Sequence, residues 1–203
     1  MDPLTLIADE LKQRDRERWL ACLYAAAPAR PGLVALFALD AELAQVVASS
    51  SDPLLGEIKL AWWRDRLTEL DTGPAPAQPL LQALQVRVLP RLKGAELALL
   101  EDYWLSRLGN GGAPSPADDG QATLFQAAGR LLGGDFAEAG MLGLALVQGL
   151  AVPGRTSVLL RPLRALVELA RRDAARLAAG QPPEPRGALA RQALMFKVVA
   201  LGR

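Results

Sequence analysis

The chain carries few side chains that could perform chemistry. None of its 203 residues is histidine, which excludes Ser-His triads and histidine metal sites. Cys22 is the single cysteine, and we expect it to be a small core residue rather than a nucleophile. Two carboxylate pairs have helical spacing, Asp65 with Glu69 and Asp135 with Glu138. Such pairs can bridge a metal ion, and they are also common on solvated helix faces.

Two arginines are candidates for binding an anion, because a guanidinium makes a fixed two-pronged contact with phosphate. Arg64 follows two tryptophans, and Arg155 lies in a Pro-Gly-Arg loop. The alternative for Arg64 is an ion pair with an acid on a neighbouring helix, for which Glu42 is a candidate. Trp63 can line an apolar ligand site, although burial in the core is the simpler interpretation.

Basic residues are concentrated in the last third of the chain. Residues 140–203 contain 10 basic and 3 acidic side chains, whereas residues 1–139 contain 13 and 19. This pattern suits an anionic ligand, a protein partner or an anionic membrane surface, and the segment Arg161–Arg176 is the candidate contact. Aromatic residues do not interleave with these cations, so we expect no nucleic acid partner. Arg14, Arg16 and Arg18 alternate with acids, which predicts a solvated face.

The beginning of the chain, Met1-Asp2-Pro3, is acidic and does not resemble a signal peptide. The longest uncharged run covers residues 139–154, which is too short for a membrane-spanning helix. We therefore expect a cytoplasmic protein that is soluble or attached to a membrane surface.

Proline, glycine and serine clusters divide the chain into apolar helical blocks, with no alternation typical of strands. The pattern predicts a single all-α domain over residues 1–203. The short serine turn at 49–51 predicts that the helices Ala35–Ser49 and Asp52–Asp71 pack as antiparallel neighbours. The predicted helices are Pro3–Ala27, Pro31–Ala48, Asp52–Asp71, Pro79–Leu89, Gly94–Leu108, Ala117–Leu132, Asp135–Leu150, Pro162–Ala179 and Arg186–Leu201.

Three segments, Asp15–Leu20, Phe37–Val46 and Gly56–Arg64, resemble the squalene/phytoene synthase family. The helix Ala117–Leu132 and the segment Gly143–Leu163 resemble it more weakly. The resemblance implies a multi-helix bundle of the isoprenoid synthase type, here shortened at its C-terminus. In that fold two aspartate-rich motifs face each other across a cavity and bind Mg²⁺, which holds the diphosphates of two prenyl substrates.

The chain departs from this family at both motifs. Lining up Phe37-Ala38 with the family's pattern places the first motif on Ala44, Gln45 and Ala48, none of which is acidic. The second motif should fall in Gly143–Leu150, which contains no acid. The sequence of these segments is similar to that of degenerate family members, such as the mitochondrial complex I assembly factor-like proteins. We therefore expect no catalytic residue, no metal ligand and no cofactor, with Mg²⁺ as the alternative if the chain is active.

The nearby acids Asp40 and Glu42 lie two residues apart and point to opposite sides of a helix, so they cannot replace the motif. The candidates for substrate binding are Asp40, Glu42, Trp63, Arg64 and Arg155.

Three hypotheses about function follow. The first is a family member that has lost prenyl transfer and binds a hydrophobic, isoprenoid or prenyl diphosphate ligand, or a protein partner. The second is an active head-to-head prenyl transferase that makes squalene or phytoene. The third is a helical interaction scaffold without a ligand cavity. Whether the chain is an enzyme is open at this point.

Overall fold

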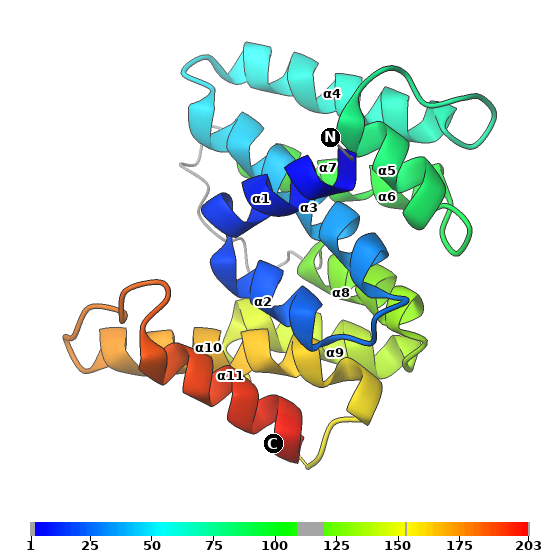
Figure 1. Ribbon diagram of the computed structural model, residues 1–203. Helices are drawn as coiled ribbons and strands as arrows, with labels where there is room; N and C mark the ends of the chain where they lie inside the picture. Colours follow the sequence, from blue (N-terminus) through cyan, green and yellow to red (C-terminus); the bar gives the residue numbers. More distant parts are fainter. Residues whose placement is uncertain (1–2, 109–119, 153, 203) are drawn as a thin grey trace.

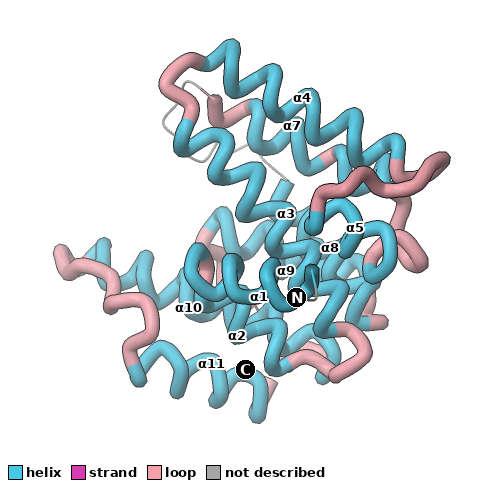
Figure 2. Tube along the Cα trace, turned by 45° about the horizontal axis from the view of Figure 1, so that its top comes forward, coloured by secondary structure: helices cyan, strands magenta, loops and turns pink. Residues whose placement is uncertain are grey.

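A computed structural model describes residues 3–108, 120–152 and 154–202, and this part of the chain is all-α, without strands (Figures 1 and 2). The all-α prediction is therefore confirmed. The described residues share one hydrophobic core. The helices are α1 (Pro3–Arg14), α2 (Arg16–Tyr24), α3 (Arg30–Ser49), α4 (Pro53–Glu69), α5 (Pro79–Arg87), α6 (Gly94–Ala98), α7 (Leu100–Leu105), α8 (Gly120–Leu132), α9 (Phe136–Gln148), the 3₁₀ turn η1 (Val158–Leu160), α10 (Arg161–Ala178) and α11 (Leu189–Leu201).

Helix α3 lies at the centre of the molecule, and six other helices pack against it: α1, α2, α4, α5, α7 and α8. Every residue from Gly32 to Asp40 is buried. By length and composition α3 is also apolar enough to cross a membrane, a test that buried core helices pass as well. Packing on all sides accounts for its apolar sequence. The location of the protein in the cell stays a prediction.

Two predicted helices are each divided into two. The block predicted over Pro3–Ala27 breaks at Asp15, whose side chain accepts a hydrogen bond from the Arg18 backbone N–H at 3.0 Å. This N-cap starts α2 in a new direction. The block predicted over Gly94–Leu108 consists of α6 and α7, which meet at Leu99. The beginning of the helix predicted from Ala117 lies outside the described residues, and α8 is described from Gly120.

Helix α4 begins as the sequence predicts, with Asp52 accepting a hydrogen bond from the Leu54 N–H at 2.9 Å and Pro53 in the first turn. Its main contacts are with α6 and α7 rather than with α3. In Figure 1 it leaves the turn at a wide angle to α3. The predicted antiparallel pairing therefore applies only near the turn. The close approach to α6 requires glycine at position 94, where a Cβ atom would lie 2.0 Å from the Leu67 carbonyl oxygen.

The other half of the molecule consists of two tightly packed helix pairs, α8 with α9 and α10 with α11. Gly143 lets α9 approach α8, since a Cβ atom there would lie 2.3 Å from the Gln121 carbonyl oxygen. Arg191 of α11 is buried and bonds Glu17 of α2 and Asp173 of α10, the latter at 2.5 Å and 2.9 Å. This ion-pair network attaches α11 to the first half of the chain.

Candidate functional site

A cavity of about 490 Å³ lies between α3 and the helices that face it, and we call it the central cavity. Helix α3 lines it from Asp40 to Ala48, α7 and α8 contribute aromatic and polar side chains, and α9 contributes Leu146 and Val147. The described residues that line it are Arg14, Asp15, Arg18, Asp40, Ala41, Ala44, Gln45, Ala48, Tyr103, Trp104, Arg107, Gln121, Leu146, Val147 and Arg186.

A buried polar cluster forms part of the cavity wall. Asp40 is fully buried, and its carboxylate accepts hydrogen bonds from the Arg18 guanidinium and, at 2.8 Å, from the indole N–H of Trp104. Arg18 also donates to the Gln121 side-chain oxygen at 3.1 Å and lies 3.6 Å from the Asp15 carboxylate. The cluster thus joins α2, α3, α7 and α8. Buried charges are normally paired and hydrogen-bonded in this way.

The electrostatics of the cluster favour the ion pair. Burial acts to lower the pKa of Arg18, but attraction to Asp40 and Asp15 outweighs it and raises the pKa above its ordinary value. Arg18 therefore stays charged, and its positive charge is offset by two carboxylates. The expectation that Arg18 lies on a solvated face is wrong, because its side chain is only 16% exposed.

The described residues that line the cavity do not fit a magnesium site. Ala44, Gln45 and Ala48 line the cavity on α3, and Leu146 and Val147 line it on α9. These are the two walls on which the resemblance places aspartates, and none of the five offers a carboxylate. The acids among the described lining residues are Asp15 and Asp40, and both face Arg18. Mg²⁺ requires several hard oxygen ligands and retains waters, which these side chains do not supply. No described group of three or more His, Cys, Asp or Glu side chains is placed to hold a metal ion.

Arginine is the prevalent charged residue of the cavity. Besides Arg18, three arginines line it: Arg14, Arg107 and Arg186. Arg107 is buried and lies over the Tyr103 ring, with its guanidinium carbon 4.1 Å from the ring centroid. Arg186 is exposed and donates to the Arg14 carbonyl oxygen at 2.9 Å. Arg14 is paired with Glu42, and Arg18 with Asp15 and Asp40. Arg186 is thus the exposed arginine of the described lining that forms no ion pair with a described acid.

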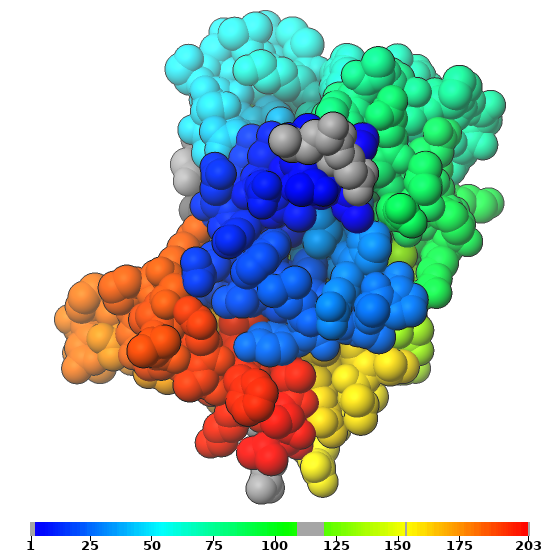
Figure 3. Space-filling view, in the orientation of Figure 1, coloured from blue at the N-terminus to red at the C-terminus, as the bar shows by residue number. Residues whose placement is uncertain are grey.

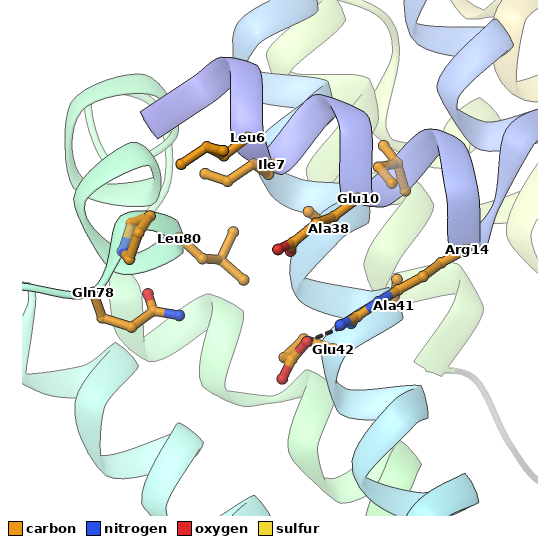
Figure 4. Close-up of a pocket in the computed structure, with 11 residues that line it drawn as sticks. Leu6, Ile7, Glu10, Arg14, Ala38, Ala41, Glu42, Gln78 and Leu80 are labelled. Atoms are coloured by element: carbon orange, nitrogen blue, oxygen red, sulfur yellow. Dashed lines mark hydrogen bonds and ion pairs between the residues drawn. The ribbon is translucent and has the colours of Figure 1, made fainter. Parts of the chain in front are cut away.

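Of the five residues predicted to bind substrate, the structure places only Asp40 in the central cavity. Glu42 lies on the other side of α3, where it forms an ion pair with Arg14 at 2.5 Å. Figure 4 shows this pair in a smaller pocket of about 270 Å³ between α1, α3 and α5, together with Leu6 and Leu80. Asp40 and Glu42 thus face different pockets, as their spacing predicts.

Trp63 and Arg64 lie away from the cavity on α4. Trp63 is buried in the core and packs edge-to-face against Trp62, with ring centroids 5.2 Å apart. Arg64 is exposed and pairs with Asp65 at 3.2 Å and with Glu101 at 4.0 Å, so Glu42 is not its partner. Glu101 is a buried carboxyl whose pKa is raised by burial, although attraction to Arg64 opposes that shift.

Arg155 lies at the far end of α9, where it is exposed and donates to the Leu201 carbonyl oxygen at 3.2 Å. Most arginines of the segment Arg161–Arg176 bond within the protein. Arg171 pairs with Glu168 at 3.0 Å and Arg172 with Glu184 at 2.6 Å, while Arg164 is buried against backbone carbonyls. These bonds reduce the positive charge that the segment offers to a partner.

The remaining candidates for chemistry have structural positions. Cys22 is buried, and burial raises the pKa of its thiol to about 12, as expected of a core residue. In the carboxylate pairs, Asp65 pairs with Arg64 at 3.2 Å, and Glu69 pairs with Arg66, three residues before it, at 2.5 Å. Asp135 caps α9, and Glu138 accepts a hydrogen bond from the Ser157 N–H.

Comparison with known proteins gives one family match. The model of the squalene/phytoene synthase family matches residues 11–103, which extend from the end of α1 to α7. That family has the all-α isoprenoid synthase fold. The matched region includes Arg18, Asp40 and the Ala44–Ala48 face, whereas α8 and α9 lie outside it. No curated protein and no solved structure matches the chain.

Proposed function

We propose that the chain, whose residues 11–103 match the model of the squalene/phytoene synthase family, binds an isoprenoid ligand with an anionic head group without transferring a prenyl group. The ligand occupies the central cavity. Arginine, rather than magnesium, holds its head group.

One observation carries this proposal. The cavity walls on α3 and α9 present Ala44, Gln45, Ala48, Leu146 and Val147 where the family resemblance places metal-binding acids. Prenyl transfer begins with departure of pyrophosphate, and metal ions stabilise most of the charge that develops on it. Without metal ligands the cavity can hold a diphosphate but does not stabilise its departure to the same extent.

The charge of the cavity supports anion binding. Four arginines line it together with two carboxylates, and both carboxylates are paired with Arg18. Arg186 donates to a backbone carbonyl and forms no ion pair with a described acid. Arg186 is exposed at the rim, where its guanidinium can reach an incoming anion.

The apolar part of the lining supports an isoprenoid tail. Ala41 and Ala44 of α3 and Leu146 and Val147 of α9 contribute methyl groups to the lining, and Trp104 adds an indole ring that is fixed by its hydrogen bond to Asp40. Small side chains on α3 leave space beside this ring. An amphipathic molecule can place its chain there and its head near the arginines.

Calorimetry with farnesyl diphosphate, in EDTA and in magnesium, tests the proposal. We expect binding of similar affinity in both buffers and no C30 product in a parallel incubation. Arg186→Gln should weaken binding at least several-fold, because it removes one charge-assisted contact. Arg64→Gln is the matched control and should bind as the wild type does, since Arg64 lies on α4. Magnesium-dependent binding, or formation of a C30 condensation product, would instead support the active-transferase alternative.

A second variant tests whether the Ala44 face lines a ligand space. Ala44 is half-buried and Ala48 is exposed, so neither is held in tight helix contact. The double change Ala44→Asp with Ala48→Asp should therefore fold normally and place two carboxylates one turn apart in the cavity. We expect it to weaken binding in EDTA by repelling the anionic head. Unaltered affinity would place the ligand elsewhere.

A further inference from the structure

The end of the molecule farthest from α4 has an exposed apolar surface that does not involve the central cavity. Four side chains define it, and we call it the basal surface: Met141 of α9, Leu150 after α9, Val158 of η1 and Leu201 at the end of α11. Their exposures are 63%, 52%, 69% and 41%. Large apolar side chains gathered in this way commonly mark an interaction site.

Hydrogen bonds bring these segments together. The Ser157 N–H donates to Glu138 of α9 at 2.9 Å, which holds Val158 near the first turns of α9. The Thr156 N–H donates to the Gly202 carbonyl oxygen at 3.0 Å, which places the end of α11 beside the same loop. Figures 1 and 3 show the yellow segment near residue 150 and the red end of α11 side by side at this end.

An apolar groove of about 410 Å³ enters the basal surface. Met141, Leu142 and Leu144 of α9 form one side, and Leu150 and Val152 form the other. Gly149 adopts a left-handed conformation (φ 65°), which ends α9 and turns the chain back along it. The groove is therefore a consequence of the tight turn after α9.

Two exposed cations lie among the apolar side chains of the basal surface. The acids of α9, Asp135 and Glu138, both lie at its start, where each accepts a hydrogen bond from a backbone N–H. Two cations flank the apolar side chains: Arg155 in the loop and Lys197, which lies one turn before Leu201 on the same face of α11. Within the described chain neither forms an ion pair with an acid. Two copies of this surface would repel each other, which argues against self-association.

We propose that the basal surface docks on an anionic lipid bilayer. The exposed apolar side chains enter the interface, and Arg155 and Lys197 contact the negative head groups. A bilayer supplies both the apolar layer and the negative charge that this surface lacks. The proposal does not depend on the ligand of the central cavity. It also places the membrane contact on a different surface from Arg161–Arg176.

Vesicle flotation tests the proposal, with phosphatidylcholine vesicles that do or do not contain phosphatidylglycerol. We expect the wild type to float with the anionic vesicles and much less with the neutral ones. Arg155→Gln with Lys197→Gln should weaken binding by about fivefold per cation. Leu150→Asp with Val158→Asp should weaken it by about tenfold or more. Binding should also decrease as salt is raised above about 0.1 M.

The exposed apolar stripe of α4 provides a matched control. Leu54 and Ile58 are 61% and 58% exposed, but acids flank them. Leu54→Asp with Ile58→Asp should bind anionic vesicles as the wild type does. Absence of flotation with anionic vesicles, or equal losses in the two apolar double variants, would overturn the proposal.

A fluorescent label gives a second readout that does not depend on affinity alone. Because Cys22 is buried, Leu150→Cys creates the one accessible thiol for a polarity-sensitive dye. The emission of this dye should shift to shorter wavelength when anionic vesicles are added. The same dye on Ile58→Cys should show no shift. A shift at position 58 but not at position 150 would place the membrane contact on α4 and contradict the proposal.

Discussion

Replacing Asp40 by asparagine tests whether the buried cluster holds the cavity walls together. Asparagine keeps the shape of the side chain and can still accept the Trp104 hydrogen bond. It removes the negative charge and turns an amide toward Arg18, whose side chain is only 16% exposed. Arg18 would keep Asp15, 3.6 Å away, and Gln121. Loss of one partner of a buried pair costs about 3–5 kcal/mol, and the adjoining cavity places this case near the lower value, about 3 kcal/mol.

Glu42→Gln is the matched control, because it makes the same chemical change two residues further along α3. The Arg14–Glu42 pair is 40% and 32% exposed, so its loss should cost only about 0–1 kcal/mol. In a domain of this size 1 kcal/mol corresponds to about 2–4 °C in Tm. Thermal unfolding should therefore show a decrease of about 6–12 °C for Asp40→Asn and little change for Glu42→Gln. Equal shifts in the two variants would refute the assignment of Asp40 as the buried partner.

Three further predictions concern the scaffold around the cavity. Gly143→Ala should destabilise the protein by about 1–3 kcal/mol in urea unfolding, because its Cβ would lie 2.3 Å from the Gln121 carbonyl oxygen. In the control Gly73→Ala the nearest atom lies 3.7 Å from the added Cβ, so the free energy of unfolding should change little. The pKa of Glu101 is raised in the folded state, so the protein loses folding stability as the pH rises from the ordinary value of 4.5 through the folded pKa. Glu101→Gln should remove that loss. Thermal melting with the same pH dependence in wild type and variant would contradict this prediction. The Cys22 thiol, whose pKa is about 12, should react with a thiol reagent at pH 8 only after unfolding, and rapid reaction of the native protein would show that it is accessible.

The sequence predicts the helical content and the main breaks because proline, glycine and capping residues act locally. Asp52-Pro53 begins α4 as expected, and the apolar run of α3 is buried as its composition requires. The division between α1 and α2 is also a local effect, because Asp15 at the break is itself the N-cap of α2. The hydrophobic pattern alone does not reveal which apolar side of α4 is buried. In the structure Leu60 is buried, whereas Leu54 and Ile58 are exposed.

The site was harder to predict because its contacts join distant parts of the chain. Arg18 bonds Asp40, 22 residues away, and Gln121, 103 residues away. From the sequence Arg18 is one of several alternating charges, and only the fold distinguishes it from its neighbours. A usable signal was Asp40 itself, since a single acid within a run of buried residues requires a buried partner.

The position of Asp40 explains what holds the cavity wall in place where the chain lacks the acids of the family pattern. Asp40, Ala44 and Ala48 are spaced by four residues and lie along one face of α3. Asp40 is the acid on this face, and it is neutralised by an arginine from α2 rather than by a metal ion. This pairing joins α2 to α3 and orients Trp104, so the walls are fixed by side chains alone. Asp40 thus takes part in fixing the wall to which the proposed ligand would bind, and Arg186 at the same cavity donates to a backbone carbonyl rather than to a described acid.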